Sequence, residues 1–251
     1  MADNKIRTGE LFAGIGGIGL GLEATGGFEV VWQVENNDYA TKVLEKNWPA
    51  VRRWDDVKTF PPETGTWDVD LITAGFPCQD ISVAGKGEGL DGKKSGLFYE
   101  VIRIAGIIKP RWLLLENVSA LLIRGIGDVL RELAQIGYDS EWHCIPAAHV
   151  GAPHRRDRIY IMAHANSEGL QGQRGLEETS QICTQEAIRL FRRSIGQNQW
   201  GIIPDIPRMV NGVPRRVDRT KCLGNAVVPQ VAQFIGEIIL QRDQELFRKD
   251  E

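Results

Sequence analysis

Short apolar runs of strand length alternate with helix-length segments along the first part of the chain. Strands are predicted at residues 10–13, 28–34, 69–74, 112–115 and 158–162, and helices at 38–48, 96–108 and 125–136. Several of these runs are rich in Leu, Ile and Val, which is typical of strands buried on both faces. This strand–helix–strand rhythm predicts an α/β fold with a mostly parallel sheet.

The rhythm ends after Ala163. Residues 164–216 are rich in Gly, Gln, Ser, Arg and Glu and hold one weak helical pattern, at 184–193. A last helix is predicted from about Pro229 to Phe247. We therefore interpret residues 1–163 together with 217–251 as one body, and 164–216 as a short insertion into it.

Composition excludes several classes of protein. A net charge of -3 does not favour wholesale nucleic-acid binding, although a local basic face on an acidic body is compatible with it. The four cysteines form no Cys-x-x-Cys pair and the four histidines complete no zinc pattern, so neither a metal nor disulfides are expected. The N-terminus lacks the apolar core of a signal peptide, and no apolar run looks long enough to span a bilayer. A cytoplasmic location without a membrane partner is expected.

A glycine pattern follows the first predicted strand. Gly14, Gly16 and Gly19 fit Gly-x-Gly-x-x-Gly, which lets backbone N–H groups approach a ligand closely. Glu35 ends the next predicted strand, where a carboxylate can accept hydrogen bonds from ribose hydroxyls. The pattern favours a bound cofactor, either a nicotinamide dinucleotide or S-adenosylmethionine. The alternative is a glycine-rich turn followed by a surface glutamate.

A cysteine follows the strand predicted at 69–74, within Gly75-Phe76-Pro77-Cys78-Gln79. Ligands bind beyond the carboxyl ends of parallel strands, so Cys78 is a candidate nucleophile. Residues 84–95 are rich in glycine and charge, which favours an exposed closing loop. The alternative for Cys78 is a small buried hydrophobic residue.

Charged residues also lie beside two further predicted strands. Glu116 follows the strand at 112–115, where apolar neighbours should raise its pKa so that it can share a proton with a base ring. Arg156 and Arg158 precede and begin the next strand, and alternation places them on one side, suited to a phosphate or a base oxygen. The alternatives are a helix cap for Glu116 and a solvated charge run for the arginines.

Together and in this order, these segments resemble the bacterial and phage DNA (cytosine-5-)-methyltransferases. The motifs that carry the resemblance are Leu11-Phe12-Ala13-Gly14-Ile15-Gly16-Gly17, Glu35, Asp56-Val57, Gly75-Phe76-Pro77-Cys78-Gln79, Ser95-Gly96-Leu97-Phe98, Glu116-Asn117-Val118, Arg156-x-Arg158 and Gly224-Asn225-Ala226-Val227-Val228-Pro229. They cover about residues 9–163 and 217–236.

The resemblance implies a role for each matching residue. It implies that Glu35 binds the cofactor ribose and that Asp56 and Val57 meet the adenine. The catalytic residues that it implies are Cys78, Glu116, Arg156 and Arg158. The cofactor-binding residues are Phe12, Ala13, Gly14, Ile15, Gly16, Gly17, Glu35, Asp56, Val57, Gly75, Pro77, Leu97, Asn225 and Ala226. The residues expected to contact DNA are Gln79, Ser82, Lys86, Lys93, Lys94 and Arg155.

The resemblance also implies the fold and the reaction. The expected fold is that of S-adenosylmethionine-dependent methyltransferases, a Rossmann-like mixed, mostly parallel sheet with helices on both faces, plus a small recognition lobe at 164–216. The expected reaction transfers a methyl group from S-adenosylmethionine to carbon 5 of a flipped cytosine in double-stranded DNA, through a Cys78 adduct. A monomer in a bacterial or phage-infected cell is expected, with a cognate restriction endonuclease as genetic partner.

The chain departs from the family pattern at two places. His154 stands where the family usually has glutamine, and the recognition region at 164–216 is short, which predicts a short or degenerate target. A transfer-RNA cytosine-5 methyltransferase is one alternative, although the Cys-Phe-Thr run of such relatives is absent. A catalytically impaired DNA-binding relative is another. A dehydrogenase would leave the Pro-Cys and Glu-Asn motifs unexplained.

Overall fold

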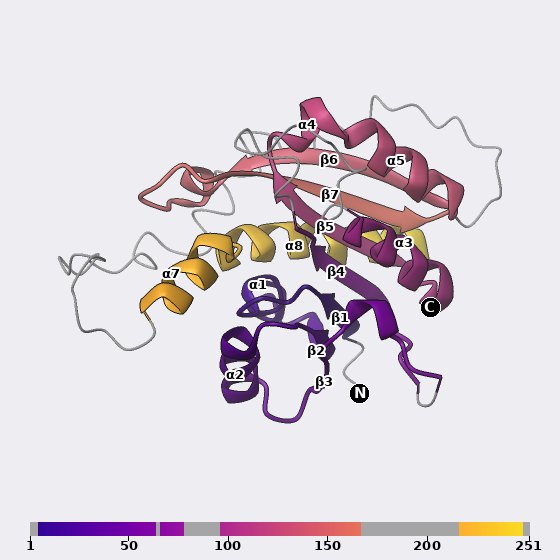
Figure 1. The fold of residues 1–251 in the computed structure, drawn as a ribbon. Coiled ribbons are helices and arrows are strands. Elements are labelled where there is room, and N and C mark those ends of the chain that lie inside the picture. Colours follow the sequence, from indigo (N-terminus) through magenta and orange to yellow (C-terminus); the bar gives the residue numbers. More distant parts are fainter. Residues whose placement is uncertain (1–4, 64–65, 78–95, 167–215, 248–251) are drawn as a thin grey trace.

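The computed structural model describes residues 5–63, 66–77, 96–166 and 216–247, and its centre is a seven-stranded sheet (Figure 1). The strands run in the order β3-β2-β1-β4-β5-β7-β6. Pairing is parallel from β3 to β5, while β7 is antiparallel to both of its neighbours. The strands are β1 (Ile6–Leu11), β2 (Phe28–Val34), β3 (Arg52–Trp54), β4 (Leu71–Gly75), β5 (Trp112–Val118), β6 (Tyr138–Pro146) and β7 (Asp157–Ala165). The predicted mostly parallel α/β fold is confirmed.

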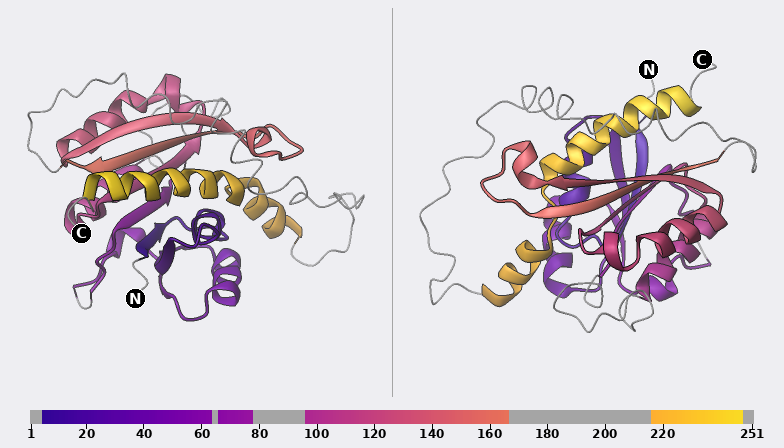
Figure 2. Two further views of the ribbon diagram at one scale, coloured as in Figure 1. Left: turned by 180° about the vertical axis from the view of Figure 1, so that it is seen from behind. Right: turned by 90° about the horizontal axis from the view of Figure 1, so that it is seen from above.

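Helices cover both faces of the sheet, as the two views of Figure 2 show. On one face α1 and α8 pack on β1, β4 and β5 through a core that includes Leu22, Phe28 and Ile235. On the other face α3 and α5 pack through a core that includes Phe98, Ile104 and Leu133. The helices are α1 (Gly17–Glu23), α2 (Asp38–Asn47), η1 (Val57–Thr59), α3 (Leu97–Ile108), α4 (Leu121–Arg124), α5 (Ile126–Gln135), η3 (Ala147–Val150), α7 (Arg216–Asn225) and α8 (Pro229–Phe247).

Strand β6 was not predicted from the sequence, and neither was α7. Strand β6 lies at the sheet edge beside β7, and its side chains are mostly part-exposed rather than buried. An edge strand of this kind carries polar residues such as Asp139, Ser140 and Glu141, so it lacks the apolar run that reveals a central strand. By contrast β5 is buried from Trp112 to Glu116, and its apolar run predicted it.

Polar contacts hold α8 against the sheet. The buried carboxylate of Asp243 accepts a hydrogen bond from Trp112 Nε1 at 3.0 Å and pairs with Arg111 Nη1 at 2.9 Å. Arg242, also buried, pairs with Glu141 on β6 at 2.5 Å. These pairs fix the helix to β5 and β6 at the end away from α7 (Figure 1).

The stretch Lys221–Phe247 is long and apolar enough to cross a membrane by length and composition, contrary to the expectation from sequence. Residues 226–228 interrupt it, however, and α8 buries Val231, Ile235 and Ile239 in the core beside α1. Its hydropathy is therefore that of a core helix.

The insertion predicted at 164–216 lies mostly outside the described residues. His164 and Ala165 still belong to β7, where they pair with Trp112 and Tyr138. Arg216 begins α7.

Candidate active site

A cavity of about 360 Å³ opens where the carboxyl ends of β1, β2, β4 and β5 meet the start of β7. The chain forms its walls from five places that are distant in sequence: the loop after β1, the end of β2, the end of β4, the end of β5 and the turn between α7 and α8. Strand order changes direction here, since β1 lies between β2 and β4. Open α/β sheets bind their ligands in such a crevice, and the volume suits a small-molecule site.

Most of the residues predicted to bind a cofactor line this cavity. The ten that do so are Phe12, Ala13, Gly14, Ile15, Gly17, Glu35, Gly75, Pro77, Asn225 and Ala226. Glu116 and Arg158, both predicted to be catalytic, line the same cavity. The structure therefore brings together residues that lie more than two hundred positions apart in the chain.

The glycine loop is tied to Glu35. Gly14 N donates to Glu35 Oε2 at 2.7 Å, and Asn37 N donates to Oε1 at 2.8 Å. Gly14 has a φ of 58°, and a side chain there would point into open space. A carboxylate offers about four acceptor positions, so Glu35 keeps capacity for ligand hydroxyls after these two bonds.

Gly17 explains how the C-terminal motif reaches the cavity. A Cβ atom on Gly17 would lie 2.6 Å from the carbonyl oxygen of Val227, a distance that real side chains do not tolerate. Glycine at this position therefore lets the turn between α7 and α8 pack directly on the start of α1. That contact places Asn225 and Ala226 on the cavity wall.

Glu10 is a cavity residue that sequence reasoning did not single out. Its side chain is fully buried on β1 and accepts hydrogen bonds from Gly19 N and from Gln33 Nε2, each at 2.8 Å. Burial raises its pKa to about 7, against the lowering effect of these two bonds. Glu10 thus anchors α1 to the first two strands beneath the glycine loop.

Buried Glu116 forms an ion pair with Arg158 in the lining of the cavity. Arg158 Nε lies 3.0 Å from Glu116 Oε1, and the Glu116 side chain is only 9% exposed. Burial raises the pKa of Glu116 to about 7, although the guanidinium groups of Arg158 and Arg156 oppose the rise. A carboxyl group in this state can either donate or accept a hydrogen bond near neutral pH. The predicted rise in pKa is confirmed in direction.

Arg156 turns toward the C-terminal motif. Its Nη2 donates to the carbonyl oxygens of Gly224 at 2.8 Å and Ala226 at 2.6 Å. Arg156 is absent from the described walls of the cavity, and its backbone has a φ of 37°. The sequence predicts that both guanidinium groups face one ligand, but only Arg158 lines the cavity, while Arg156 bonds to the turn between α7 and α8.

Cys78 itself lies outside the described residues, as do Gln79, Ser82, Lys86, Lys93 and Lys94. Both neighbouring segments are firmly held. Before Cys78, Pro77 lines the cavity, and the carbonyl of Phe76 accepts a hydrogen bond from Asn117 Nδ2 at 3.3 Å. After residue 95, Phe98 is fully buried and its ring centroid lies 5.2 Å from that of Phe76. Asn117 therefore ties the end of β5 to the segment after β4, a role that sequence reasoning did not assign to it.

Asp56, Val57, Leu97 and Gly16 do not appear on the described walls of the cavity. Val57 is buried in the core that α3 covers, and both Phe12 and Leu97 pack against that same core. Gly16 instead faces the ring of Trp48 at the end of α2.

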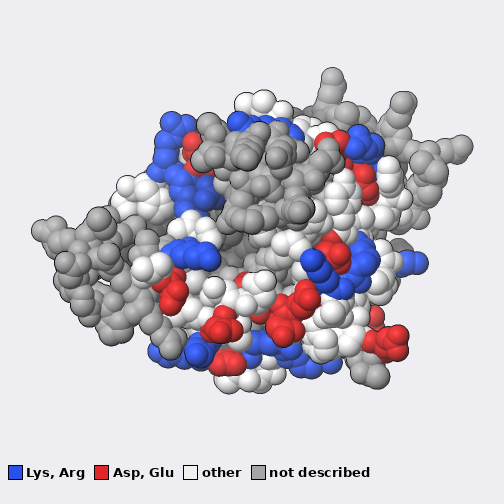
Figure 3. Space-filling model, viewed as in Figure 1, with Lys and Arg blue, Asp and Glu red and all other residues white. Residues whose placement is uncertain are grey.

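The charge pattern around the cavity is mixed, as Figure 3 shows. Lys and Arg side chains gather over the end of the β6–β7 hairpin and near α7, while acidic side chains are concentrated in the lower half of the view. Arg155, predicted to contact DNA, is 83% exposed in the connection between β6 and β7 and pairs with Asp157. Lys221 of α7 lines the cavity.

Comparison with known proteins decides the family. The C-5 cytosine-specific DNA methylase family matches residues 6–208, most of the chain. The chain belongs to this family. Its relatives include the Type II methyltransferase M.CviJI of Paramecium bursaria Chlorella virus IL3A, which is 39% identical over 160 residues, 63% of this chain and 43% of that protein. They also include the Type II methyltransferase M.Sau3AI of Staphylococcus aureus, 37% identical over 195 residues, 70% of this chain and 47% of that protein.

The solved structures agree on the fold of this family member. The S. pombe Dnmt2 methyltransferase superposes with a TM-score of 0.56 at 21% identity, over 71% of this chain and 55% of that one. The predicted methyltransferase fold is therefore confirmed. The chain spans about half the length of the curated relatives that it matches.

Proposed function

We propose that this chain is a DNA (cytosine-5-)-methyltransferase that uses S-adenosylmethionine. The observation that carries the proposal is the ion pair between buried Glu116 and Arg158, which faces the same cavity as the glycine loop and the Pro77 turn that leads to Cys78. A base-holding acid, a cofactor loop and the approach to a thiol thus share one space. Membership of the family supports the same assignment.

The cavity walls fit the proposed cofactor. Glu35 retains acceptor capacity for ribose hydroxyls beside the open space at Gly14, and Asn225 and Ala226 line the same cavity. Phe12 contributes an apolar surface, and Gly75 and Pro77 end the wall toward the substrate. When bound, S-adenosylmethionine supplies an activated methyl group. Asp56, Val57 and Leu97 are proposed to border its adenine end, Ile15 and Gly17 its methionine end, and Gly16 to support the loop.

The proposed chemistry overcomes the weak nucleophilicity of carbon 5 of cytosine. The thiolate of Cys78 would add to carbon 6, and the electron pair of the 5,6 double bond would let carbon 5 bond to the methyl carbon. The bond from that methyl carbon to the cofactor sulfur would break, with its electron pair staying on the sulfur. Loss of the carbon-5 proton to a base then restores the double bond and expels Cys78 as thiolate. Since the ring is inaccessible in a duplex, the base must be flipped out.

Glu116 and Arg158 would hold the flipped ring during these steps. Protonated Glu116 can donate to the ring nitrogen at position 3 and accept from the exocyclic amine, which stabilises charge that develops on addition of the thiol. Arg158, fixed by its bond to Glu116, would contact the base oxygen. Arg156 supports the cofactor turn beside them.

The proposal extends to partners and to the region outside the described residues. We infer that the catalytic body continues to Ala165 at the end of β7 and resumes at Arg216, the first residue of α7, and that the residues between them form a short recognition lobe. Exposed Arg155, together with Gln79, Ser82, Lys86, Lys93 and Lys94, would contact phosphates, which position a protein on DNA without reading sequence. Because the relatives named above are Type II methyltransferases, a cognate restriction endonuclease in a bacterial or phage-infected cytoplasm is proposed, with a monomeric methyltransferase.

Covalent trapping tests the function. Duplex DNA of random sequence that carries 5-fluorocytosine in place of cytosine should form a denaturation-resistant adduct when S-adenosylmethionine is present, because fluorine cannot leave as a proton does. Cys78→Ser should abolish the adduct. Cys144→Ser, at an exposed position of β6, is the matched control and should retain it. An adduct of equal yield on Cys78→Ser would refute the assigned nucleophile, and bisulfite sequencing of DNA from expressing cells would identify the target.

A further inference from the structure

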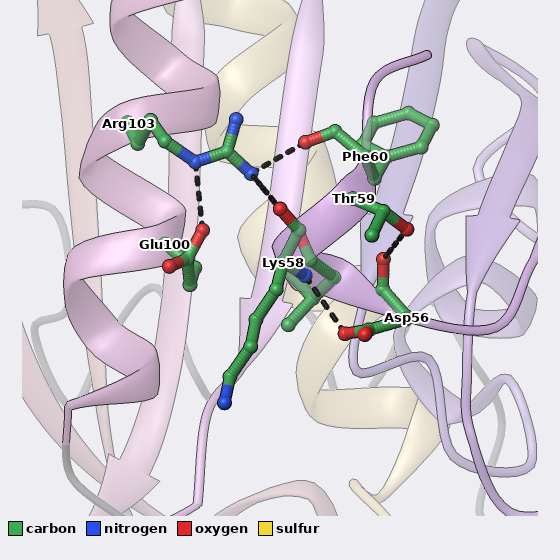
Figure 4. A network of polar contacts seen from close by, with 7 residues as sticks. Asp56, Lys58, Thr59, Phe60, Glu100 and Arg103 are labelled. Atoms are coloured by element: carbon green, nitrogen blue, oxygen red, sulfur yellow. Dashed lines mark hydrogen bonds and ion pairs between the residues drawn. The ribbon is translucent and has the colours of Figure 1, made fainter.

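Arg103 of α3 makes a set of contacts that the reaction does not explain. Its Nη2 donates to the backbone carbonyl oxygens of Val57 at 3.0 Å and Phe60 at 2.5 Å, with Lys58 O at 3.5 Å (Figure 4). Its Nε pairs with Glu100 Oε2 at 2.7 Å, which holds the guanidinium toward η1. The guanidinium of Arg103 on α3 thus provides the hydrogen-bond donor for carbonyl oxygens at the end of η1.

The turn that Arg103 holds is capped at its other end by Asp56. The Asp56 side chain accepts from Lys58 N at 2.9 Å, and its backbone carbonyl accepts from Thr59 N and from Thr59 Oγ1. An isolated turn of three residues has too few internal hydrogen bonds to keep one conformation. The conformation of η1, and with it the position of Asp56 and Val57, therefore depends on the Asp56 cap at its start and on the Arg103 bonds at its end.

The same helix carries Leu97. Leu97, Glu100 and Arg103 follow one another at intervals of three along α3, so they lie toward one side of the helix. Leu97 and Phe12 pack against the core that contains Val57. Arg103 accordingly sets the spacing between η1 and α3, which carry two of the residues proposed to border the adenine.

We propose that Arg103 is a positioning residue that holds Asp56 and Val57 where they select the adenine base of the cofactor. The inference rests on the proposed use of S-adenosylmethionine. The Asp56 carboxylate has acceptor capacity beyond its bond from Lys58, which suits the exocyclic amine of adenine. A hypoxanthine ring, which carries an oxygen in place of that amine, would be disfavoured there.

Calorimetry with two ligands tests the role of Arg103. S-adenosylhomocysteine should bind the wild-type protein at least about tenfold more tightly than S-inosylhomocysteine, since a site built for a donor rejects an acceptor. Arg103→Ala should weaken S-adenosylhomocysteine by about tenfold and leave S-inosylhomocysteine nearly unchanged, so the preference collapses. In steady-state assays the variant should raise KM for S-adenosylmethionine while kcat and KM for DNA stay unchanged.

Arg131→Ala is the matched control. Arg131 pairs with Asp128 three residues earlier on α5, as Arg103 does with Glu100, but this pair is exposed. Both affinities should be those of the wild type. If thermal melts show that Arg103→Ala is unfolded, Arg103→Lys is measured in its place. This variant keeps the charge but not the planar guanidinium, so it should lose part of the preference for S-adenosylhomocysteine over S-inosylhomocysteine.

The possible results distinguish a failure of the positioning role of Arg103 from a failure of the proposed function. An Arg103 variant that keeps the wild-type preference for adenine, or that weakens both ligands equally, overturns the positioning role while the proposed function stands. A wild-type protein that binds neither ligand overturns the proposed cofactor, and the inference falls with it.

Discussion

The protonation of Glu116 yields a quantitative prediction about stability. Burial raises the pKa of Glu116 from 4.5 to about 7 in the folded protein. At 1.36 kcal/mol per pH unit, this difference corresponds to about 3 kcal/mol between the folded and unfolded states. Between these two pH values the folded protein holds a proton that the unfolded chain has released, so stability must fall as pH rises. The contribution is fully present below about pH 4.5 and is lost as pH rises through about 7.

Urea unfolding followed by tryptophan fluorescence measures this loss. Across the window from about pH 5 to about pH 7, Glu116 should lower the free energy of unfolding by up to about 1.4 kcal/mol per pH unit. Glu116→Gln cannot release a proton, so the decrease of its unfolding free energy with pH should be smaller by that amount. Glu10→Gln should behave alike, because burial also raises the pKa of Glu10 to about 7. Glu29→Gln, at an exposed position of β2, is the matched control and should keep the wild-type slope.

Activity should respond to the same proton. If protonated Glu116 holds the ring nitrogen, kcat/KM should decline above about pH 7, and Glu116→Gln should lack this alkaline limb while Glu10→Gln keeps it. The reasoning would be refuted by a Glu116→Gln protein whose unfolding free energy depends on pH as strongly as that of the wild type. Such a result would mean that Glu116 is already ionised in the folded state.

Two further variants test the contacts that assemble the site. Arg156→Ala removes the donors to the carbonyl oxygens of Gly224 and Ala226, so calorimetry should show S-adenosylmethionine binding weakened by about tenfold, while the 5-fluorocytosine adduct still forms at saturating cofactor; unchanged affinity would contradict the role of Arg156 in supporting the turn. Asp243→Ala leaves buried Trp112 Nε1 without its acceptor and leaves Arg111 with Asp70 as its remaining carboxylate partner, so urea unfolding should show a loss of about 2–3 kcal/mol, and a variant as stable as the wild type would contradict the anchoring of α8.

Much of the site could be predicted because parallel strands end at one edge. Each apolar run that marked a central strand also marked where its carboxyl end lies, so Glu35 after β2, Pro77 after β4 and Glu116 on β5 were expected at a common site. Burial of the central strands makes their sequence pattern strong, and the glycine loop after β1 was expected from local spacing alone. Order along the chain was enough to indicate the family.

Tertiary structure alone decided which of these residues act on one another. Glu10 belongs to an ordinary strand in the sequence, and only the packing of α1 and Gln33 around it produces a buried carboxyl group with a raised pKa. Arg156 and Arg158 look equivalent in sequence, yet one bonds to the turn between α7 and α8 and the other to Glu116. The contact of Arg103 with η1 spans more than forty residues. Local propensity acts through neighbours in sequence, whereas these bonds join segments that only the folded chain brings within hydrogen-bond distance.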